Sequence, residues 1–418
     1  MKKLYILFFY YFLNTNAQTV STFAGNSPGF VDGIGTSAKF NGPAGLDFGP
    51  DGNLYVADRV NHRIRKITPS GTVTTIAGSV QGFADGAGTS ALFNSPMNLT
   101  VDNTGIIYVA DSGNNRIRKI MTDGNVTTLA GSAEGFSDGT VSNALFYSPE
   151  GIFITTNGII YIGDTGNQRI RKIMPDGTVT TLAGGTLGNA DGIGSAAQFW
   201  SPCGLTVDSN GTVFVAEKKN RIRKITDSGV VTTFVGSSTS GYIDGVGTTA
   251  RLNTPFDVTV DSSGILYVTD SGNNRIRKVM PDGTISTLAG STNGYVDGIG
   301  TAAKFNYPIG ICLSNDGSLF IGESGGGKIR KITTTLSSSN FTLDNKVTFY
   351  PNPVKDILYL DYISASKATI YSLLGQQLEV KDIDTSSSTI DLSKYAKGIY
   401  IITLENENQT QTIKVIKE

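Results

Sequence analysis

The chain is poor in the side chains on which most metal-dependent and nucleophilic catalysis rests. Its 418 residues include one histidine, His62, and two cysteines, Cys203 and Cys312. A single histidine argues against a histidine-based metal site and against a Ser-His-Asp triad. The two cysteines form neither a C-x-x-C pair nor a disulfide framework, and we expect both to be buried apolar side chains. We therefore predict no catalytic residues and no metal ligands.

The chain also lacks an excess of charge of either sign. It carries 34 Lys and Arg against 35 Asp and Glu, which gives a formal net charge of −1. Attraction of a whole protein to nucleic acid or to an anionic membrane usually comes with a strong basic excess. We therefore expect no nucleic-acid partner.

Long apolar runs are absent except at the N-terminus. There Lys2 and Lys3 precede an apolar run over residues 4–13, and the small residues of T-N-A at 15–17 follow. This order is typical of a signal peptide that is cleaved before Gln18; an uncleaved anchor is the alternative. The run is too short to cross a bilayer as a helix. We predict a signal peptide at residues 1–17, no transmembrane segment and a monomeric protein.

What the chain does have is glycine, with 51 residues, and a repeat. The segment D-S-G-N-N-R-I-R-K-I at residues 111–120 recurs in six copies, each 53 residues after the previous one. The copies begin at Asp58, Asp111, Asp164, Glu217, Asp270 and Glu323. Asp-Gly pairs keep the same period at Asp32, Asp85, Asp138, Asp191, Asp244 and Asp297, and prolines keep it at Pro43, Pro96, Pro149, Pro202, Pro255 and Pro308. A constant period predicts a repeat architecture.

Each unit reads as four short strands separated by glycine-rich turns. In the second unit the strands are N-L-T-V-D, I-I-Y-V-A-D, R-I-R-K-I and N-V-T-T-L-A. Six such units predict an all-β, six-bladed β-propeller over residues 18–335. The sixth unit lacks its fourth strand, which T-V-S-T-F-A at residues 19–24 matches, so we expect the N-terminal strand to complete the last blade. A solenoid, the alternative, would need capping units at both ends.

The recurring Y-V-A-D, G-N-N-R-I-R-K and Asp-Gly elements resemble the NHL repeat family over about three quarters of the chain. The long A-D-G-x-G-T-x-A-x-F-N-x-P connection is similar to that of bacterial secreted NHL proteins. The resemblance implies a six-bladed propeller in a family whose members mostly bind partners. Its minority of enzymes use metal sites with several histidines, and the single His62 argues against membership of that group.

Charged residues recur in every copy of the ten-residue motif. We expect the first arginine of a copy to pair with the aspartate five residues earlier, across the turn. These structural pairs are Asp58–Arg63, Asp111–Arg116, Asp164–Arg169 and Asp270–Arg275. A basic ring that attracts polyanions is the alternative, but the presence of the pair in every blade and the near-neutral net charge favour the structural role.

The Asp-Gly pairs allow two interpretations. Clustered carboxylates and carbonyls suit calcium, which is the one cofactor that we consider possible. The spacing matches neither a helix–loop–helix calcium loop nor a nine-residue Gly/Asp repeat. Asp followed by Gly is also a common turn sequence, so we expect a role in turns and no cofactor.

Departures from the repeat point to a candidate ligand site. Two positions after the blade proline stands glycine in four units, but Asn98 in the second and Asp257 in the fifth. These units lie opposite each other in a six-membered ring, and first strands line the channel of a propeller. We predict a ligand or cation site at the channel mouth formed by Asn98, Asp257 and Glu150, although strand alternation turns Glu150 to the other face.

The composition changes after the sixth unit. Residues 336–341 read as a Ser-rich linker, and residues 342–418 contain short alternating strands typical of a small β-sandwich. This tail resembles the type A sorting domain of the type IX secretion system. The residues that carry the resemblance are Tyr350, Pro351, Asn352, Pro353, Gly375, Gly398 and Tyr400. An ordinary adhesive β-sandwich is the alternative.

Together these features predict an exported binding protein, secreted or held at the outer cell surface, with a protein or glycan ligand and the type IX secretion machinery as a partner. A propeller hydrolase or lyase with a channel-bound cation is the alternative, and a purely architectural surface module is a third possibility. The sequence names no ligand and leaves release or surface anchoring open.

Overall fold

The computed structural model describes residues 17–335, 348–361, 367–372, 377–383, 388–405 and 410–418. The chain divides into two compact units, residues 1–335 and 336–418. The expected signal peptide, apart from Ala17, and the expected linker lie outside the described residues, as does Gly375. Within the described part, no helix is long and apolar enough to cross a membrane.

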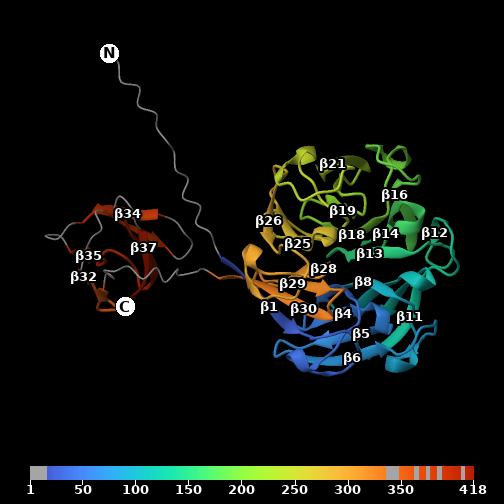
Figure 1. Cartoon of the computed structure of the whole chain (residues 1–418), viewed down its shortest axis with the longest axis horizontal. Coiled ribbons are helices and arrows are strands. Elements are labelled where there is room, and N and C mark those ends of the chain that lie inside the picture. The colour runs from blue at the N-terminus through green and yellow to red at the C-terminus, as the bar shows by residue number, and fades with distance from the viewer. Residues whose placement is uncertain (1–16, 336–347, 362–366, 373–376, 384–387, 406–409) are drawn as a thin grey trace, which may run out of the picture. The chain divides into compact units, whose positions relative to one another are not determined.

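The first unit is a ring of six antiparallel sheets, the six-bladed propeller that the repeat predicts (Figure 1). Blade one consists of β3 (Pro43–Phe48), β4 (Leu54–Asp58), β5 (Arg63–Ile67), β6 (Thr72–Gly78) and β2 (Gly33–Ile34), from the axis outward. All five residues of β4 are buried, as its apolar sequence predicts for a strand covered on both faces.

The other blades repeat this order. Blade two has β8 (Pro96–Val101), β9 (Ile107–Asp111), β10 (Arg116–Ile120), β11 (Asn125–Ala130) and β7 (Gly86–Ala87). Blade three has β13 (Pro149–Ile154), β14 (Ile160–Asp164), β15 (Arg169–Ile173), β16 (Thr178–Gly184) and β12 (Gly139–Thr140). Blade four has β18 (Pro202–Val207), β19 (Val213–Glu217), β20 (Arg221–Ile225), β21 (Val230–Gly236) and β17 (Gly192–Ile193). Blade five has β23 (Pro255–Val260), β24 (Leu266–Asp270), β25 (Arg275–Val279), β26 (Thr284–Ala289) and β22 (Gly245–Val246).

Blade six closes the ring with strands from both ends of the propeller. It contains β28 (Pro308–Leu313), β29 (Leu319–Glu323), β30 (Lys328–Thr335), β1 (Ala17–Ala24) and β27 (Gly298–Ile299). The N-terminal β1 pairs antiparallel with β30 on one side and with β27 on the other. The expected closure is confirmed, and it covers an edge that would otherwise be open.

Each blade has one short strand more than the four that we expected. The fifth strand is two residues long, comes from the connection that precedes the blade, and pairs at the outer edge, as β2 does with β6. Short 3-10 turns follow these strands at η1 (Gly35–Ser37), η3 (Gly88–Ser90), η6 (Gly194–Ala196), η7 (Gly247–Thr249) and η9 (Gly300–Ala302). Two residues are too few to show an alternating pattern, which is why the sequence gives no sign of them.

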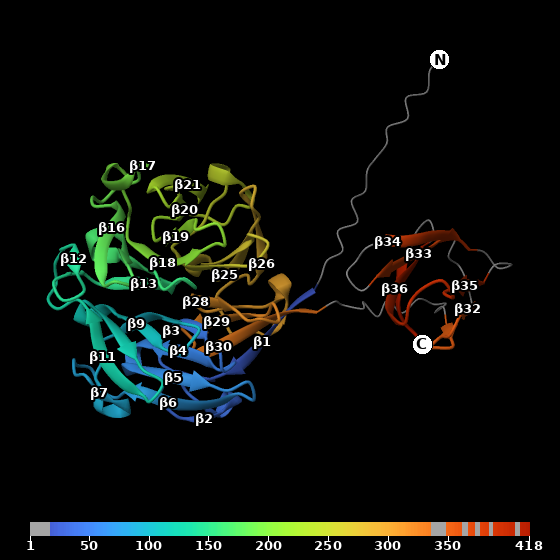
Figure 2. The same ribbon diagram turned by 180° about the vertical axis from the view of Figure 1, so that it is seen from behind.

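The inner strands β3, β8, β13, β18, β23 and β28 stand around the axis (Figures 1 and 2). The second strand of each blade ends at one face of the propeller, where a turn leads into the third strand. In blades one, two, three and five this turn contains a short 3-10 helix: η2 (Arg59–Asn61), η4 (Ser112–Asn114), η5 (Thr165–Asn167) and η8 (Ser271–Asn273). We call this face the motif face, because it carries the start of each ten-residue motif. Register pairs Pro43 with Asp58, so the inner strands begin at this same face.

The second unit contains two small sheets around one core. One sheet has the order β31 (Thr348–Tyr350), β32 (Ile357–Asp361), β35 (Thr389–Asp391), and the other β34 (Gln377–Asp382), β33 (Lys367–Ser372), β36 (Gly398–Glu405), β37 (Thr410–Lys417). Leu358 and Ile390 of the first sheet and Ile370 and Ile402 of the second belong to one buried cluster. This is the small β-sandwich that the alternating strands predict.

Candidate functional site

The carboxylate at the start of each motif pairs with the second arginine of the motif, so our prediction that it pairs with the first arginine is wrong. In blade one the Arg65 Nη1 donates to the Asp58 Oδ2 over 2.7 Å, and both side chains are fully buried. Arg63 lies opposite Asp58 in the strand register but donates to the carbonyl oxygen of Asn61 in its own turn. The same correction holds for Asp111–Arg118, Asp164–Arg171 and Asp270–Arg277, and blades four and six use Glu217–Arg223 and Glu323–Arg330.

The Asp-Gly pairs supply a second carboxylate to the same arginine. The Arg65 Nη2 donates to the Asp32 Oδ1 over 2.6 Å, and Asp32 also accepts from the backbone and hydroxyl of Thr75 in β6. The remaining guanidinium hydrogen bonds go to the carbonyl oxygens of Lys39 and Val31. Asp32 therefore ties the connection to the blade through Arg65. In every blade the Asp-Gly aspartate accepts from the arginine that also pairs with the motif carboxylate, which gives these aspartates a structural role.

The first basic residue of the motif instead stacks on an aromatic ring. The Arg63 guanidinium lies 3.7 Å from the centre of the Phe30 ring. Equivalent contacts join Arg116 to Phe83 at 3.9 Å, Arg169 to Phe136 at 3.8 Å, Arg275 to Tyr242 at 4.3 Å and Lys328 to Tyr295 at 5.4 Å. In these five blades the first basic residue of the motif therefore contacts a ring of the propeller itself, which favours the structural interpretation of the motif.

Asn98 and Asp257 meet at the axis, as their opposite blades predict. The Asn98 Nδ2 lies 3.5 Å from the Asp257 Oδ2, and the two residues are 8 % and 5 % exposed. Asp257 also accepts from the backbone N–H groups of Val258 and Ile311. The two side chains therefore meet across the channel. Its direct role in ligand binding stays a prediction.

Glycines at the equivalent positions leave room for this contact. A Cβ atom added at Gly45 would lie 1.9 Å from the Asn98 Oδ1, and one added at Gly204 would lie 2.0 Å from the Asp257 Oδ1. Either distance is far inside van der Waals contact. Gly45 and Gly204 therefore leave room for the two polar side chains, whereas an added Cβ atom at Gly151 or Gly310 would meet a backbone oxygen of the next blade, at 2.0 Å and 2.1 Å.

Burial controls the ionisation of the axial carboxyls. It raises the pKa of Asp257 to about 7, although the N–H groups of Ile311 and Val258 and the Asn98 amide favour the charged form; the nearby charge of Asp47 raises it further. Burial likewise raises the pKa of Asp47 to about 6 against its hydrogen bonds from Val101 and Thr100. The axis therefore holds two carboxyls that take up protons near neutral pH.

Glu150 pairs with Lys218, a residue that the predicted group of Asn98, Glu150 and Asp257 did not include, and the grouping itself stays a prediction. Glu150 is 8 % exposed, and the Lys218 Nζ lies 2.8 Å and 2.6 Å from its two carboxylate oxygens. Burial alone would lower the pKa of Lys218, but the Glu150 carboxylate outweighs it, with Cys203 and Tyr307 adding to the rise. The Lys218 ammonium also lies 4.8 Å from the centre of the Phe256 ring. We call Glu150, Lys218 and their surroundings the mouth cluster.

A shortened turn brings Lys218 to this place. Blade four runs Glu217-Lys218-Lys219-Asn220 before Arg221, one residue fewer than the D-S-G-N-N turn of blades two and five. The structure has no 3-10 turn between β19 and β20, whereas η2, η4, η5 and η8 occupy that place in blades one, two, three and five. The sequence analysis did not predict Lys218 as a site residue, although the turn of blade four is visibly one residue shorter than its equivalents.

Exposed aromatic side chains stand just before the inner strands of blades three, four and six. Tyr147 and Trp200, in blades three and four, are 41 % and 37 % exposed where the other blades have asparagine. The Lys219 ammonium lies 4.8 Å from the centre of the Trp200 ring. Tyr307 of blade six is 40 % exposed, and it is one of the groups that affect the Lys218 pKa. Beneath them, Met97, Phe256 and Ile309 fill the axis.

The rare residues have structural roles. The His62 Nδ1 accepts the backbone N–H of Ser95 over 3.0 Å, as the Asn115 Oδ1 accepts that of Ser148 over 2.8 Å in the next blade, so His62 is part of an inter-blade contact. Cys203 and Cys312 are free and buried, as expected. Burial raises the pKa of the Cys203 thiol. Neither the histidine nor the cysteines form part of a nucleophilic arrangement.

No metal centre is evident in the described residues. Among them, no three His, Cys, Asp or Glu side chains come close enough to hold a metal ion. The carboxylates near the axis are engaged by Lys218 and by N–H donors rather than gathered on one point. A shared ligand or cation site of Asn98, Glu150 and Asp257 stays a prediction.

The tail residues lie on the second unit. Asn352 donates to the Lys414 carbonyl and accepts the Ile416 N–H, so it ties residues 351–353 to β37. The rings of Tyr350 and Tyr359 stack at 5.6 Å. Tyr400, 9 % exposed, donates its hydroxyl to the Ala396 carbonyl. These contacts give each residue a place in the sandwich.

Family models match both parts of the chain. The NHL repeat matches residues 40–67, 93–120 and 252–279, and the secretion system C-terminal sorting domain matches residues 348–418. NHL repeat-containing protein 2 of Bos taurus is 31 % identical over 333 residues, 68 % of this chain and 46 % of that protein. Teneurin-3 of Danio rerio is 28 % identical over 77 % of this chain and 13 % of its own length. The chain spans less than half the length of these relatives.

Solved structures share the fold of the propeller. A Bacteroides thetaiotaomicron protein of unknown function superposes with a TM-score of 0.59 and 23 % identity, covering 76 % of each chain. An auxiliary nutrient binding protein from the same organism gives a TM-score of 0.60 and 19 % identity, also over 76 % of each chain. At these identities the likeness concerns the fold alone.

The sorting domain indicates export through the type IX secretion system to the cell surface or the outside. The β-propeller before it contains NHL repeats in both sequence and structure. The chain is thus an NHL-repeat β-propeller protein that ends in a secretion system C-terminal sorting domain.

Proposed function

We propose that this exported protein binds a glycan at the mouth cluster on the motif face of its propeller. The observation that carries the proposal is the Glu150–Lys218 ion pair, placed at the channel mouth by the shortened turn of blade four. Polar residues of other motif turns hydrogen-bond to the backbone of the following blade, as His62 does to Ser95, but this lysine pairs with a carboxylate on the inner strand of the preceding blade, blade three.

The chemistry of the mouth cluster suits sugars. A carboxylate accepts from sugar hydroxyl groups, and an ammonium donates to them. The Lys218 side chain retains 27 % exposure, so the ammonium has solvent access while the apolar axis below holds its stem. Tyr147, Trp200 and Tyr307 add exposed ring faces, on which the C–H faces of a sugar stack. A few polar groups among aromatic rings is the usual composition of a ligand site.

A protein ligand is the second occupant that the exposed rings support, since Trp and Tyr also anchor protein interfaces. The sugar is favoured because the mouth cluster offers a carboxylate and an ammonium instead of a broad apolar patch. A hydrolase or lyase with a channel-bound cation finds no supporting observation among the described residues. We further propose that residues 1–17 are the signal peptide, that the chain is a monomer and that it binds no nucleic acid.

A glycan array tests this proposal. The purified chain should be retained on a subset of oligosaccharides, and Lys218→Met and Trp200→Ala should each weaken that retention about tenfold. Lys172→Met is the matched control for the lysine, because Lys172 also forms an ion pair, with Asp227, but near the opposite end of blade three. Tyr242→Ala is the control for the aromatic residue, since Tyr242 is also exposed but lies over the Arg275 guanidinium in blade five. Binding to no oligosaccharide, or equal losses in the controls, would contradict a glycan site here.

A further inference from the structure

Blade four lacks the aromatic ring that covers the first basic residue of the motif in every other blade. Phe30, Phe83, Phe136, Tyr242 and Tyr295 provide that ring, and blade four has Asn189 in its place. The five rings are 43–62 % exposed, so the position is at the surface of the propeller. Blade four therefore lacks the aromatic ring over its first basic residue, Arg221, which is itself 9 % exposed.

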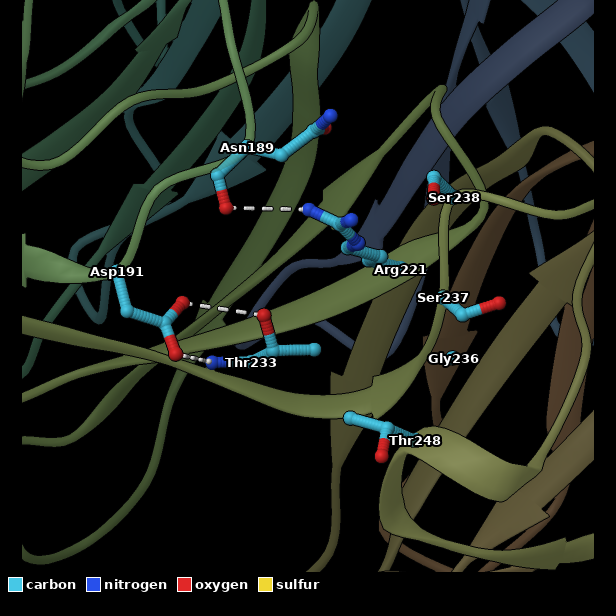
Figure 3. Close-up of a pocket in the computed structure, with 8 residues that line it drawn as sticks. All are labelled: Asn189, Asp191, Arg221, Thr233, Gly236, Ser237, Ser238 and Thr248. Atoms are coloured by element: carbon cyan, nitrogen blue, oxygen red, sulfur yellow. Dashed lines mark hydrogen bonds between the residues drawn. The ribbon is translucent and has the colours of Figure 1, made fainter.

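A pocket of about 280 Å³ occupies this position. Arg221 forms part of its lining, between Asn189 and Asp191 of the connection before the blade and Ser237 and Ser238 of the stretch after it (Figure 3). The Arg221 Nη1 donates to the Asn189 carbonyl oxygen over 3.2 Å, and the Asn189 Oδ1 is buried without a hydrogen-bond partner. An unpartnered buried oxygen is unfavourable, and a ligand that supplies a donor would relieve it.

The connection after blade four is also altered in a way that shapes the pocket. Between β21 and the next Asp-Gly pair the chain has one residue more than in the other blades, which compensates for the shortened motif turn. The Asn220 side chain donates to the Ser238 carbonyl oxygen, and this hydrogen bond joins the lengthened connection to the shortened motif turn. Thr248 of η7 completes the far side.

We propose that this pocket binds a phenol-type aromatic ring that comes from outside the chain and stacks on Arg221. The internal repeat defines the occupant, because five sister sites hold a phenyl or phenol ring on the same cation. A phenol fits better than a plain phenyl ring, because the buried Asn189 Oδ1 lacks a donor and Ser237, Ser238 and Thr248 add hydroxyl groups to the lining. The ring belongs either to a tyrosine of a peptide partner or to a free phenolic molecule.

Titration calorimetry of the full chain distinguishes these sources and tests the proposal. N-acetyl-tyrosinamide represents the peptide source and p-cresol the free phenol, and we expect at least one to bind. The source is peptide if N-acetyl-tyrosinamide binds more tightly than p-cresol, and a free phenolic molecule otherwise. Asn189→Phe supplies the missing ring from the chain itself, so it should weaken binding by about tenfold or more while keeping or raising the melting temperature.

Asn189→Tyr is a second pocket-filling variant with the same expectation, and Asn103→Phe, which adds a ring at an exposed turn outside the pocket, is the matched control that should retain binding. N-acetyl-cyclohexylalaninamide, which has the shape of the ring without its π face, should bind more weakly than the tyrosine probe. The proposal is overturned if neither phenol binds at millimolar concentration, if the filled variants bind as well as the parent chain, or if the cyclohexyl probe binds equally.

Discussion

Asn98 and Asp257, 159 residues apart in the sequence, meet at the centre of the propeller with the amide nitrogen 3.5 Å from the carboxylate oxygen. They lie on the inner strands of opposite blades, where the remaining four blades have glycine. The contact explains why two blades depart from the repeat at this position.

The buried Asp257 should make the stability of the propeller depend on pH. Its pKa rises from 3.8 to about 7, so above pH 7 the folded protein carries a buried charge, whereas below about pH 4 the carboxyl is neutral in both states and the cost vanishes. Asp257→Asn should therefore gain stability relative to the parent as pH rises from 4 to 8, by up to about 4 kcal/mol.

Urea unfolding of the two proteins at pH 4, 6 and 8 measures this difference. Asp123→Asn, at an exposed turn carboxylate, is the matched control and should change little across the range. A constant difference between Asp257→Asn and the parent at all three pH values would show that the carboxyl does not titrate as its burial implies.

The glycines of the axial ring should tolerate no side chain. Gly45→Ala places a methyl group 2.5 Å from the Asn98 Cα as well as against its side chain, so rotation of Asn98 does not relieve the clash. We expect a loss of about 1–3 kcal/mol or more in the free energy of unfolding. Gly33→Ala is the control, because an added Cβ there meets atoms at 3.4 Å or farther. Equal stability of the two variants would mean that the centre of the ring is looser than described.

The two arginines of one motif should differ sharply in their contribution to stability. Arg118→Met leaves the fully buried Asp111 without its cation, which should cost about 3–5 kcal/mol. Arg116→Met removes a partly exposed contact with Phe83 and a hydrogen bond to the Asn114 carbonyl oxygen, and should cost about 1 kcal/mol. Chemical unfolding of both variants measures the contrast. A larger loss from Arg116 would restore the pairing that we first expected from the sequence.

The sorting domain should be required for export. A chain without residues 348–418 should accumulate in the periplasm, while Lys397→Ala, an exposed substitution within the domain, should be exported normally. Immunoblots of periplasmic, cell-surface and culture fractions decide the matter. Mass spectrometry of the exported protein then shows whether the domain is removed. Equal export with and without the domain would leave the tail as an ordinary β-sandwich.

Much of the fold can be predicted from the sequence, because the residues that recur in all six units are those that each blade needs in order to fold. The period predicts six blades, and the unpaired strand at residues 19–24 predicts the closure with β30. The partner of the motif aspartate was predicted wrongly, because distance along the strands favours Arg63. The structure shows instead that Arg65 reaches both Asp58 and Asp32. The second carboxylate lies 33 residues away, and no local pattern indicates it.

The candidate site was predicted only in part for a similar reason. Substitutions at a repeated position, such as Asn98 and Asp257, are visible against the other blades, and the ring geometry places them opposite each other. Lys218 comes from a deletion rather than a substitution, and its partner Glu150 lies in another blade. Only the folded structure shows that the shortened turn directs this lysine to the axis.

Restoring the turn of blade four tests the account most directly. A glycine inserted between Lys218 and Lys219 gives this turn the length found in blades two and five, and should draw Lys218 away from Glu150. The measurement is the calorimetric affinity of the insertion variant for the oligosaccharide that the parent chain binds best on the array. We predict an unchanged melting temperature and binding at least about tenfold weaker. Undiminished affinity would contradict the assignment of the mouth cluster as the ligand site.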